Sequence, residues 1–424
     1  HANFSFLCRN LNVLDKKGKN KIPGNQEERQ RPVFFDHNLQ IIFSITLMAV
    51  LGVASITPAF PNIGDQFGIS PARVGLLITV FTLPGIILTP IMGILADRFG
   101  RKRILVPSLF LFAIAGCGCA FFNNFQIILV LRFFQGVGAA SLGSLNAALI
   151  GDLYNGHRRG EAMGYNSSVL SVGTASYPAI GGALALIGWN FPFLLPVLAI
   201  PVGIVVLTRL KNPEPKVNQH FNAYISNAFK KILKKEILAI FLISIFTFII
   251  IYGSFLNFFP FLMKEKFGSS SFGIGITMAV VSISSAVSSS RLGVLNKHFS
   301  RKQLLLTSYL AYILALILIP FMDQLIFLIL PIVILGLANG LNIPILYTLL
   351  AEYAPLEFRG IFMSLNGMVL RIGQTLGPIV IGFFFNKIGL SAVFFSGAAC
   401  AFLMLFIALG LIKKNNKERE KMDS

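Results

Sequence analysis

The chain contains a ten-residue sequence, GILADRFGRK at residues 93–102, that returns as GVLNKHFSRK at residues 293–302. The same offset of 200 residues, without a gap, relates other positions along the chain: Phe67 and Phe267, Arg159 and Arg359, Asn166 and Asn366, Gly173 and Gly373, and Pro178 and Pro378. Self-similarity at a fixed offset indicates a repeated architecture. The chain is therefore predicted to consist of two copies of one structural unit.

The composition predicts that both copies lie in a membrane. Hydrophobic residues make up 55% of the chain and charged residues 12%, whereas soluble domains carry about 25% charged residues. The apolar residues form continuous runs of about 20 residues, which is the length that crosses a bilayer as a helix, and this continuity argues against a β-barrel. Twelve spans are expected, at residues 39–62, 72–95, 104–122, 125–151, 162–186, 191–210, 237–262, 272–295, 303–321, 325–352, 361–386 and 391–412.

The predicted fold is all-α and integral to the membrane, with twelve transmembrane helices in two six-helix repeats. Because the second repeat follows an even number of spans, both repeats have the same orientation, as in transporters with parallel repeats. The polar residues at the start of the chain lack the apolar core of a signal peptide, so no cleaved leader is expected. The expected parts are a cytoplasmic tail (1–38), a first bundle (39–210), a basic linker (211–236), a second bundle (237–412) and a second tail (413–424).

The net charge of +19 would suit a nucleic-acid-binding protein, but the positions of the charges argue against that function. Most of the 36 Lys and Arg residues fall in the tails, the linker and the loops on the same side. Such enrichment marks the cytoplasmic side, so a cell-membrane protein with both termini inside is expected, in contact with anionic lipid. The linker is predicted to form an amphipathic helix on the inner membrane surface, because apolar residues recur between its lysines: Phe221, Ile225, Phe229 and Ile232.

Neither a metal site nor a cofactor is expected. The four cysteines are Cys8 in the first tail and Cys117, Cys119 and Cys400 inside apolar spans. The Cys-Gly-Cys spacing lacks the second ligand pair of a zinc site. All five histidines lie in tails or loops. An enzyme is therefore not expected.

The sequence at residues 93–102 places the end of a helix in a tight, cationic loop. Asp97 falls at the C-terminal end of span two, where the helix dipole disfavours a negative charge. It therefore needs a nearby cation or the N-terminus of another helix, and such a residue is suited to a latch. The residues expected to act in this loop and in gating are Gly93, Asp97, Arg98, Gly100, Arg101 and Lys102.

This loop resembles the signature loop of the major facilitator superfamily, and its copy in the second half is weakened. There, Lys297 replaces the aspartate and Ser300 replaces the glycine. The resemblance covers residues 39–412 and implies a twelve-helix transporter that works by alternating access. It also implies that spans 1, 4, 7 and 10 line a central cavity and that spans 2, 5, 8 and 11 join the two halves.

Span four contains an arginine well inside the apolar run, in the sequence RFFQGVGA at residues 132–139. A charge at such a depth costs about 2.5–3.5 kcal/mol, so Arg132 must face the interior. Arg132, Gln135 and Asn146 share one helical face. The sequence resembles the second motif of the drug:proton antiporters, which implies a part for Arg132 in proton transfer, with Asp152 as a second candidate. The alternative is that Arg132 is a structural centre of hydrogen bonds to backbone carbonyls.

Span five reads GTASYPAIGG at residues 173–182 and resembles the antiporter motif of that superfamily. It departs from the motif at Tyr177, where a glycine is expected, whereas the second copy has a glycine at the equivalent position. Small residues and prolines permit bends and close packing of helices. The residues expected to serve these purposes are Gly173, Pro178, Gly182, Gly373, Gly377 and Pro378.

Polar residues inside apolar spans are candidates for the substrate cavity: Gln135, Asn146, Asn166, Tyr252, Asn257, Asn339, Asn342, Arg371 and Gln374. Arg371 lies about ten residues into span eleven, which is close to the midplane at about 1.5 Å per residue. No Asp, Glu or His lies at the middle of a predicted span. The substrate is therefore expected to carry a balancing carboxylate or phosphate. Proton coupling would depend on Asp97 or Asp152, or would be weak or absent.

These observations predict a monomeric secondary active transporter that exports small amphiphilic compounds, with protons as the coupling ion. Uptake of a specific metabolite or anion, or flipping of a lipid-linked sugar, stays open as an alternative. The further motifs of sugar transporters, after spans six and twelve, are not seen. A membrane enzyme would need a nucleophile–base pair or a metal cluster, and a sensor would need a large domain outside the membrane. The sequence shows neither feature.

Overall fold

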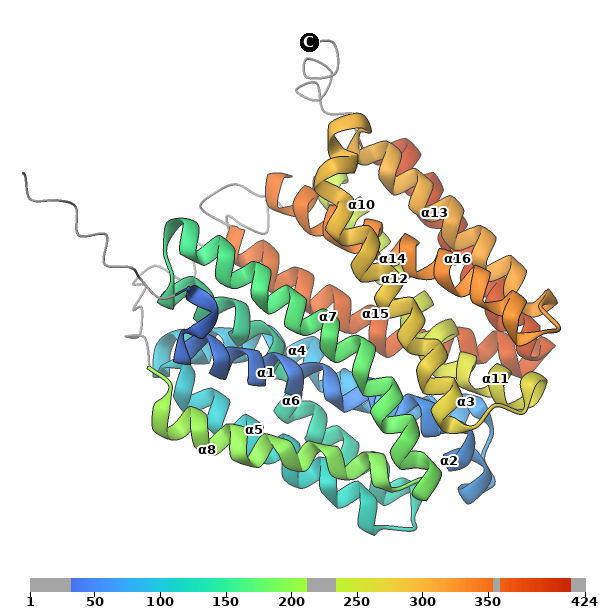
Figure 1. Cartoon of the computed structure of the whole chain (residues 1–424), viewed down its shortest axis with the longest axis horizontal. Helices are drawn as coiled ribbons and strands as arrows, with labels where there is room; N and C mark the ends of the chain where they lie inside the picture. Colours follow the sequence, from blue (N-terminus) through green and yellow to red (C-terminus); the bar gives the residue numbers. More distant parts are fainter. Residues whose placement is uncertain (1–31, 212–233, 354–358, 413–424) are drawn as a thin grey trace, which may run out of the picture.

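The protein forms two six-helix bundles that lie side by side (Figure 1). The computed structural model describes residues 32–211, 234–353 and 359–412, and the regular elements in these ranges are all helical. Twelve of the helical segments are long and apolar enough to cross a membrane, as predicted. The predicted linker helix and most of both tails lie outside the described residues.

The first bundle is made of spans one to six, and the first span is broken near its end by a short 3₁₀ turn. Its elements are α1 (His37–Ala54), η2 (Thr57–Ala59), α2 (Phe60–Phe67), α3 (Pro71–Val74), α4 (Leu76–Phe99), α5 (Arg101–Gly118), α6 (Phe125–Leu153), α7 (Gly156–Ile187), η4 (Phe191–Leu198) and α8 (Ala199–Arg209).

The second bundle repeats this order, and its first span contains a π-helical segment, η5. Pro260 follows this segment and has no N–H for an α-helical bond, which favours a local change of register. The elements are α10 (Lys235–Ile249), η5 (Ile250–Phe258), α11 (Phe259–Phe267), α12 (Ser271–His298), α13 (Arg301–Leu318), α14 (Leu325–Tyr353), α15 (Arg359–Ile388) and α16 (Leu390–Leu411).

The sequence repeat is reproduced in the structure. Helices α5 and α13, and likewise α6 and α14, begin and end at equivalent positions. Gly68 and Gly268 end α2 and α11 with left-handed φ angles of 59° and 60°, a conformation that favours glycine. The repeat is broken at the signature loop: Gly100 has a φ of 93°, whereas Ser300 caps α13 through a capping box.

Each bundle is held together by a hydrophobic core of its own. The first core includes Phe60 and Phe112, and the second includes Phe258 and Tyr309. The cores also meet: Phe261 of α11 belongs to the core of the first bundle, Tyr252 and Leu256 pack against that core, and Ala72 packs against the second core. Each bundle thus has a core of its own, and residues from both bundles pack across the contact between them.

Two pairs of long helices form a seam between the bundles, α7 with α12 and α4 with α15. The contact is close because glycines line it: a Cβ at Gly182 would meet the carbonyl oxygen of Ser271, and one at Gly275 would meet that of Pro178. Further contacts join α2 with α11 and α3 with α15. These lie at the end of the molecule that we call the distal face, opposite the terminal face, where α1 begins and α16 ends.

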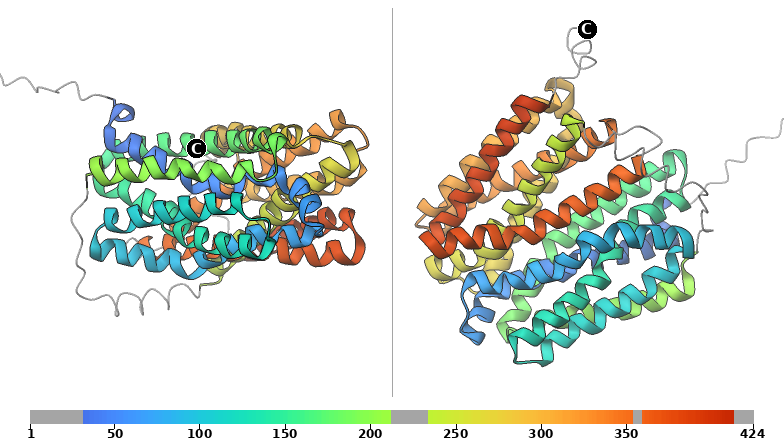
Figure 2. Two further views of the ribbon diagram at one scale, coloured as in Figure 1. Left: turned by 90° about the horizontal axis from the view of Figure 1, so that it is seen from below. Right: turned by 180° about the vertical axis from the view of Figure 1, so that it is seen from behind.

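The bundles diverge toward the terminal face, as Figure 1 and the right panel of Figure 2 show from opposite sides. Several glycines near this end have no other described atom within 4 Å of a Cβ position, among them Gly93, Gly160, Gly164 and Gly293. Gly93 therefore has no helix packed against it in this conformation, and its part in gating stays a prediction. The structure is closed at the distal face and open at the terminal face.

Candidate functional site

Arg371 lies on α15 at the seam, where it faces α4 of the opposite bundle. A Cβ at Gly85 would be 2.9 Å from Cδ and 3.0 Å from Nε of Arg371, so the absence of a side chain at Gly85 makes room for the arginine. The Arg371 Nη1 group donates to Gln374 Oε1 at 3.1 Å. Among the described residues, no carboxylate pairs with Arg371. The bundles thus meet around a cation that has no carboxylate partner in the described part of the chain.

Hydroxyl groups connect the bundles on both sides of the seam. Thr82 Oγ1 and Thr375 Oγ1 are 2.8 Å apart, and Thr79 Oγ1 donates to the Thr375 carbonyl at 3.1 Å. On the other side, Ser282 Oγ donates to the Thr174 carbonyl at 3.0 Å. The sequence analysis did not select Thr79 or Thr82. Thr79 and Thr82 are three residues apart, nearly one helical turn, so the sequence could have identified them as a polar pair on one face of an apolar span.

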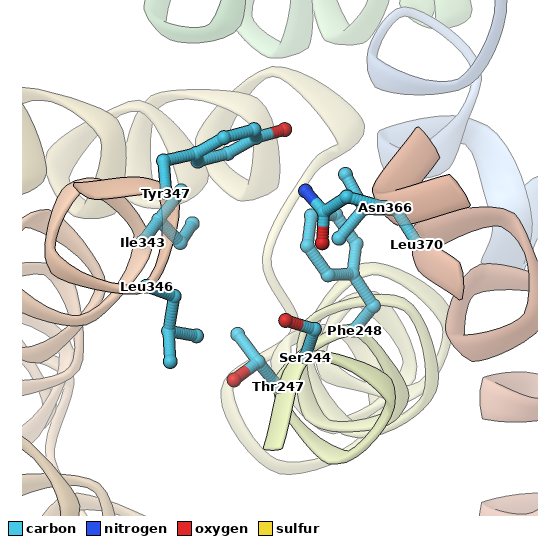
Figure 3. A pocket seen from close by; sticks show the side chains of 8 residues that line it. All are labelled: Ser244, Thr247, Phe248, Ile343, Leu346, Tyr347, Asn366 and Leu370. Atoms are coloured by element: carbon cyan, nitrogen blue, oxygen red, sulfur yellow. The ribbon is translucent and has the colours of Figure 1, made fainter. Parts of the chain in front are cut away.

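A pocket lies in the second bundle, between α10, α14 and α15 (Figure 3). Its apolar walls are formed by Phe248, Ile343, Leu346 and Leu370. No charged residue lines it. The pocket therefore suits an uncharged group.

Four polar side chains also line this pocket: Ser244, Thr247, Tyr347 and Asn366. Ser244 donates to the Ile240 carbonyl at 2.8 Å, and Thr247 accepts from Asn342 Nδ2 at 2.8 Å. The predicted cavity residue Asn342 thus does not line the pocket itself but donates a hydrogen bond to Thr247, which does. The sequence analysis identified Asn366 as a repeat position but did not place it in the cavity.

In the first bundle, two predicted cavity residues belong to one hydrogen-bonded chain. Asn146 of α6 donates to Thr46 of α1. The Thr46 hydroxyl lies 2.5 Å from Asn166 Oδ1 of α7. This chain connects amides from α6 and α7 through one hydroxyl and so links three helices of the bundle, while Asn146 Oδ1 has no partner among the described residues.

Arg132 is fully buried inside the first bundle, away from the seam. Its guanidinium donates to the carbonyls of Leu77 at 3.1 Å and Gly52 at 2.8 Å, and to Gln135 Oε1 at 2.7 Å. It also lies over the ring of Phe81, 4.3 Å from the centroid. This is the geometry of a structural centre that joins α1, α4 and α6, while the role in proton transfer stays a prediction. Gln135 is buried with it.

The other predicted cavity residues lie in three different places. Asn339 accepts from Tyr312 of α13, so it faces a helix of its own bundle. Tyr252 lies beside Phe248, with ring centroids 5.9 Å apart. Asn257 is in η5 at the distal seam, where its Nδ2 would be 2.6 Å from a Cβ at Gly75, and neither of its amide atoms has a partner among the described residues.

At the terminal face, the signature loop forms an ion-pair network within the first bundle. Arg101 Nη2 lies 2.8 Å from Asp97 Oδ1, and Arg101 Nε lies 2.6 Å from Asp152 Oδ2. Arg98 lies over the neighbouring ring of Phe99, 5.5 Å from the centroid. In the second bundle, Arg301 pairs with Glu352. The dipole argument thus placed a cation beside Asp97 correctly, and the cation is Arg101.

The glycines and prolines selected in spans five and eleven lie at close helix crossings. A Cβ at Gly173 would be 3.0 Å from Leu47, one at Gly373 would be 2.7 Å from the Ile245 carbonyl, and one at Gly377 would be 2.8 Å from the Gly253 nitrogen. Pro378 and Gly182 lie in contact with the opposite bundle. Their proposed part in bending stays a prediction.

Within the described ranges, no group of three or more His, Cys, Asp or Glu side chains could hold a metal ion. The described cysteines, Cys117, Cys119 and Cys400, are free.

Comparison with known proteins identifies a family and several relatives with similar sequences. The family model described as Major Facilitator Superfamily matches residues 42–322 and 252–423. The bacillibactin exporter of Bacillus subtilis is 26% identical over 400 residues, which are 91% of this chain and 98% of that protein. Multidrug resistance protein 1 of the same organism is 26% identical over 357 residues, or 82% and 90% of the two chains. The quinolone resistance protein NorA of Staphylococcus aureus is 30% identical over 171 residues, or 39% and 44%.

Solved structures share the fold at low sequence identity. A bacterial homologue of the human lysosomal transporter Spinster, in an inward-facing and occupied conformation, superposes with a TM-score of 0.72 at 19% identity over 90% of this chain and 97% of that one. A D-xylose-proton symporter gives a TM-score of 0.71 at 16% identity, with 89% and 98% coverage. With twelve spanning helices in two repeats and a family match across nearly the whole membrane region, the chain belongs to the Major Facilitator Superfamily.

Proposed function

We propose that the protein exports small amphiphilic compounds across the cell membrane by alternating access between its two bundles. The observation that carries the proposal is the uneven closure of the seam, which is shut at the distal face and open at the terminal face. The excess of Lys and Arg on the terminal side supports a cytoplasmic position for that face. In this conformation the protein would receive substrate from the cytoplasm. The names of the two Bacillus relatives, an exporter and a multidrug resistance protein, support this direction.

We propose further that the substrate carries an acidic group that binds Arg371. A guanidinium at membrane depth is costly without a partner, and no described carboxylate supplies one. Arg371 also lies at the seam, in contact with α4 of the other bundle. A bound carboxylate or phosphate would therefore lie where both bundles can reach it.

Protons are the proposed coupling ion, and the network at the terminal face is the proposed site of coupling. Arg101 lies between Asp97 and Asp152, whose side chains are 53% and 12% exposed. Protonation of either carboxylate would weaken its hold on Arg101, and this would loosen the link between α4, α5 and α6. A monomer suffices for this mechanism, since both bundles belong to one chain.

Transport into proteoliposomes tests these proposals together. Purified protein would be reconstituted and given a pH gradient, with carboxyfluorescein as an anionic probe and ethidium as a cationic one. We expect gradient-driven movement of the anionic probe, which Arg371→Gln should reduce. Movement that continues unchanged after the gradient is collapsed would reject proton coupling. Preference for ethidium that survives Arg371→Gln would reject the acidic substrate.

Uptake of a specific metabolite or anion is the second candidate, because an open terminal face alone does not fix a direction. The same vesicles distinguish the two candidates. Export by proton antiport predicts that an acidic vesicle interior drives accumulation of the substrate by inside-out protein. Uptake by proton symport predicts accumulation when the exterior is acidic.

A further inference from the structure

The first spans of the two bundles are irregular at equivalent positions, where they carry different side chains. Thr57 lies in the 3₁₀ turn η2 of the first bundle, and Asn257, 200 residues later, lies in the π-helical segment η5 of the second. Both side chains are fully buried. Thr57 Oγ1 donates to the Ala54 carbonyl at 3.3 Å, whereas neither amide atom of Asn257 has a partner among the described residues. The repeat is thus broken at a buried polar group.

Asn257 lies at the distal contact between the bundles. A Cβ at Gly75 of the first bundle would be 2.6 Å from Asn257 Nδ2 and 2.9 Å from Pro378 Cβ. On the other side of the seam, the equivalent Gly275 lies against the equivalent Pro178, since a Cβ there would meet the proline carbonyl oxygen. The two distal contacts thus use equivalent glycines and prolines, and the contact of α4 with α15 and η5 encloses the unpaired amide as well.

The unpaired amide affects the closed and the open distal face differently. In the closed conformation the amide is buried without a protein partner, which is unfavourable for a group with two donor hydrogens and an acceptor. When the bundles separate, water can enter between Gly75 and Asn257 and bond to both amide atoms. The side chain therefore raises the free energy of the closed conformation relative to the open one. A buried polar group left unpaired shifts such an equilibrium by about 5- to 150-fold.

We propose that Asn257 is a built-in destabilising group of the distal contact, which keeps the closed conformation close enough in free energy to the open one for the bundles to separate readily. A threonine would not have this effect, because its hydroxyl can bond to a carbonyl of the preceding turn, as Thr57 does. The π-helical register of η5 agrees with this role, since such segments are frequent at functional positions. The inference rests on the alternating access of the proposed function, but on neither the substrate nor the coupling ion.

The rate at which a buried cysteine is modified measures how often the distal face opens. Ser271 of α12 is 4% exposed, and its carbonyl oxygen lies where a Cβ at Gly182 of the opposite bundle would meet it. In protein from which the four native cysteines have been removed, Ser271→Cys should react with a charged maleimide only when the bundles separate. Mass spectrometry follows the labelling of purified protein in nanodiscs, and the unfolded protein gives the rate for an accessible thiol.

Three variants in this background separate the amide from other effects. Asn257→Leu removes the amide at similar volume, so labelling should slow by about 5- to 150-fold. Asn257→Thr introduces the side chain of the equivalent position and should also slow labelling; it decides the question if Asn257→Leu does not fold. Ser254→Ala is the matched control and should leave the rate unchanged, because Ser254 is an equally buried residue of η5 that donates to the Val393 carbonyl of its own bundle at 3.0 Å.

The outcomes distinguish this inference from the proposed function. Labelling that is unchanged or faster in both Asn257 variants would overturn the inference and leave alternating access intact, because the amide would then have a partner, such as a trapped water, in the closed conformation. Equal slowing by Ser254→Ala would also overturn it, since the effect would then not depend on the distal contact. An absence of labelling in every folded variant would reject distal opening, and with it both the inference and the proposed alternating access.

Discussion

Replacing Gly75 by alanine should open the distal face of the protein. Gly75 precedes α4 in the first bundle and faces two residues of the second. A Cβ there would be 2.9 Å from Pro378 Cβ and 2.6 Å from Asn257 Nδ2, whereas ordinary contacts begin near 3.4 Å. The proline lies on a packed helix and cannot rotate away, so the bundles must separate by about half an ångström. Overpacking of this kind costs about 1–3 kcal/mol.

Since 1.4 kcal/mol is a factor of ten, this cost corresponds to a shift of about 5- to 150-fold away from the distally closed conformation. Spin labels at Gln66 and Glu265, exposed residues near the ends of α2 and α11, would report the change by pulsed electron resonance, in protein from which the four native cysteines have been removed. We expect a new population at longer distance. Gly410→Ala is the control, because a Cβ there meets no other described atom within 4 Å. An unchanged distance distribution in Gly75→Ala, or an equal shift in Gly410→Ala, would refute the reasoning.

Three other variants separate structural from functional roles. Arg371→Gln should reduce transport of anionic amphiphiles by at least tenfold and leave cationic ones unchanged, as initial rates in vesicles would show; equal loss for both would contradict the charge argument. Arg132→Lys keeps the charge but cannot make all three hydrogen bonds, so it should cost about 1–3 kcal/mol and lower the melting temperature; an unchanged melting temperature would exclude the structural role. Asp152→Asn should destabilise the protein by about 1–3 kcal/mol, because its ion pair with Arg101 is mostly buried. The more exposed pair at Glu352 should cost less when Glu352→Gln is made, and thermal unfolding of both variants checks this order.

The sequence predicted the spans and the repeat well, because hydrophobic length and internal similarity are properties of the chain itself. The sequence did not show toward which neighbouring helix each polar side chain points. Asn339 was grouped with the cavity, but it faces Tyr312 of α13, because the rotation of α14 is set by packing. The opposition of Gly85 and Arg371 was equally hidden, since these residues belong to different bundles and meet only in the folded protein.

The separate cores have a consequence for how the protein is made. During synthesis the first bundle can pack most of its core before the second has entered the membrane, except where Phe261, Tyr252 and Leu256 of the second bundle are still missing. The buried ring of Phe261, from α11, would complete the core of the first bundle once the second bundle has been inserted. Two fragments, each containing one bundle and expressed from a separate gene, should therefore associate in the membrane. Phe261→Ala should weaken the association of the two fragments more than it lowers the stability of either fragment alone.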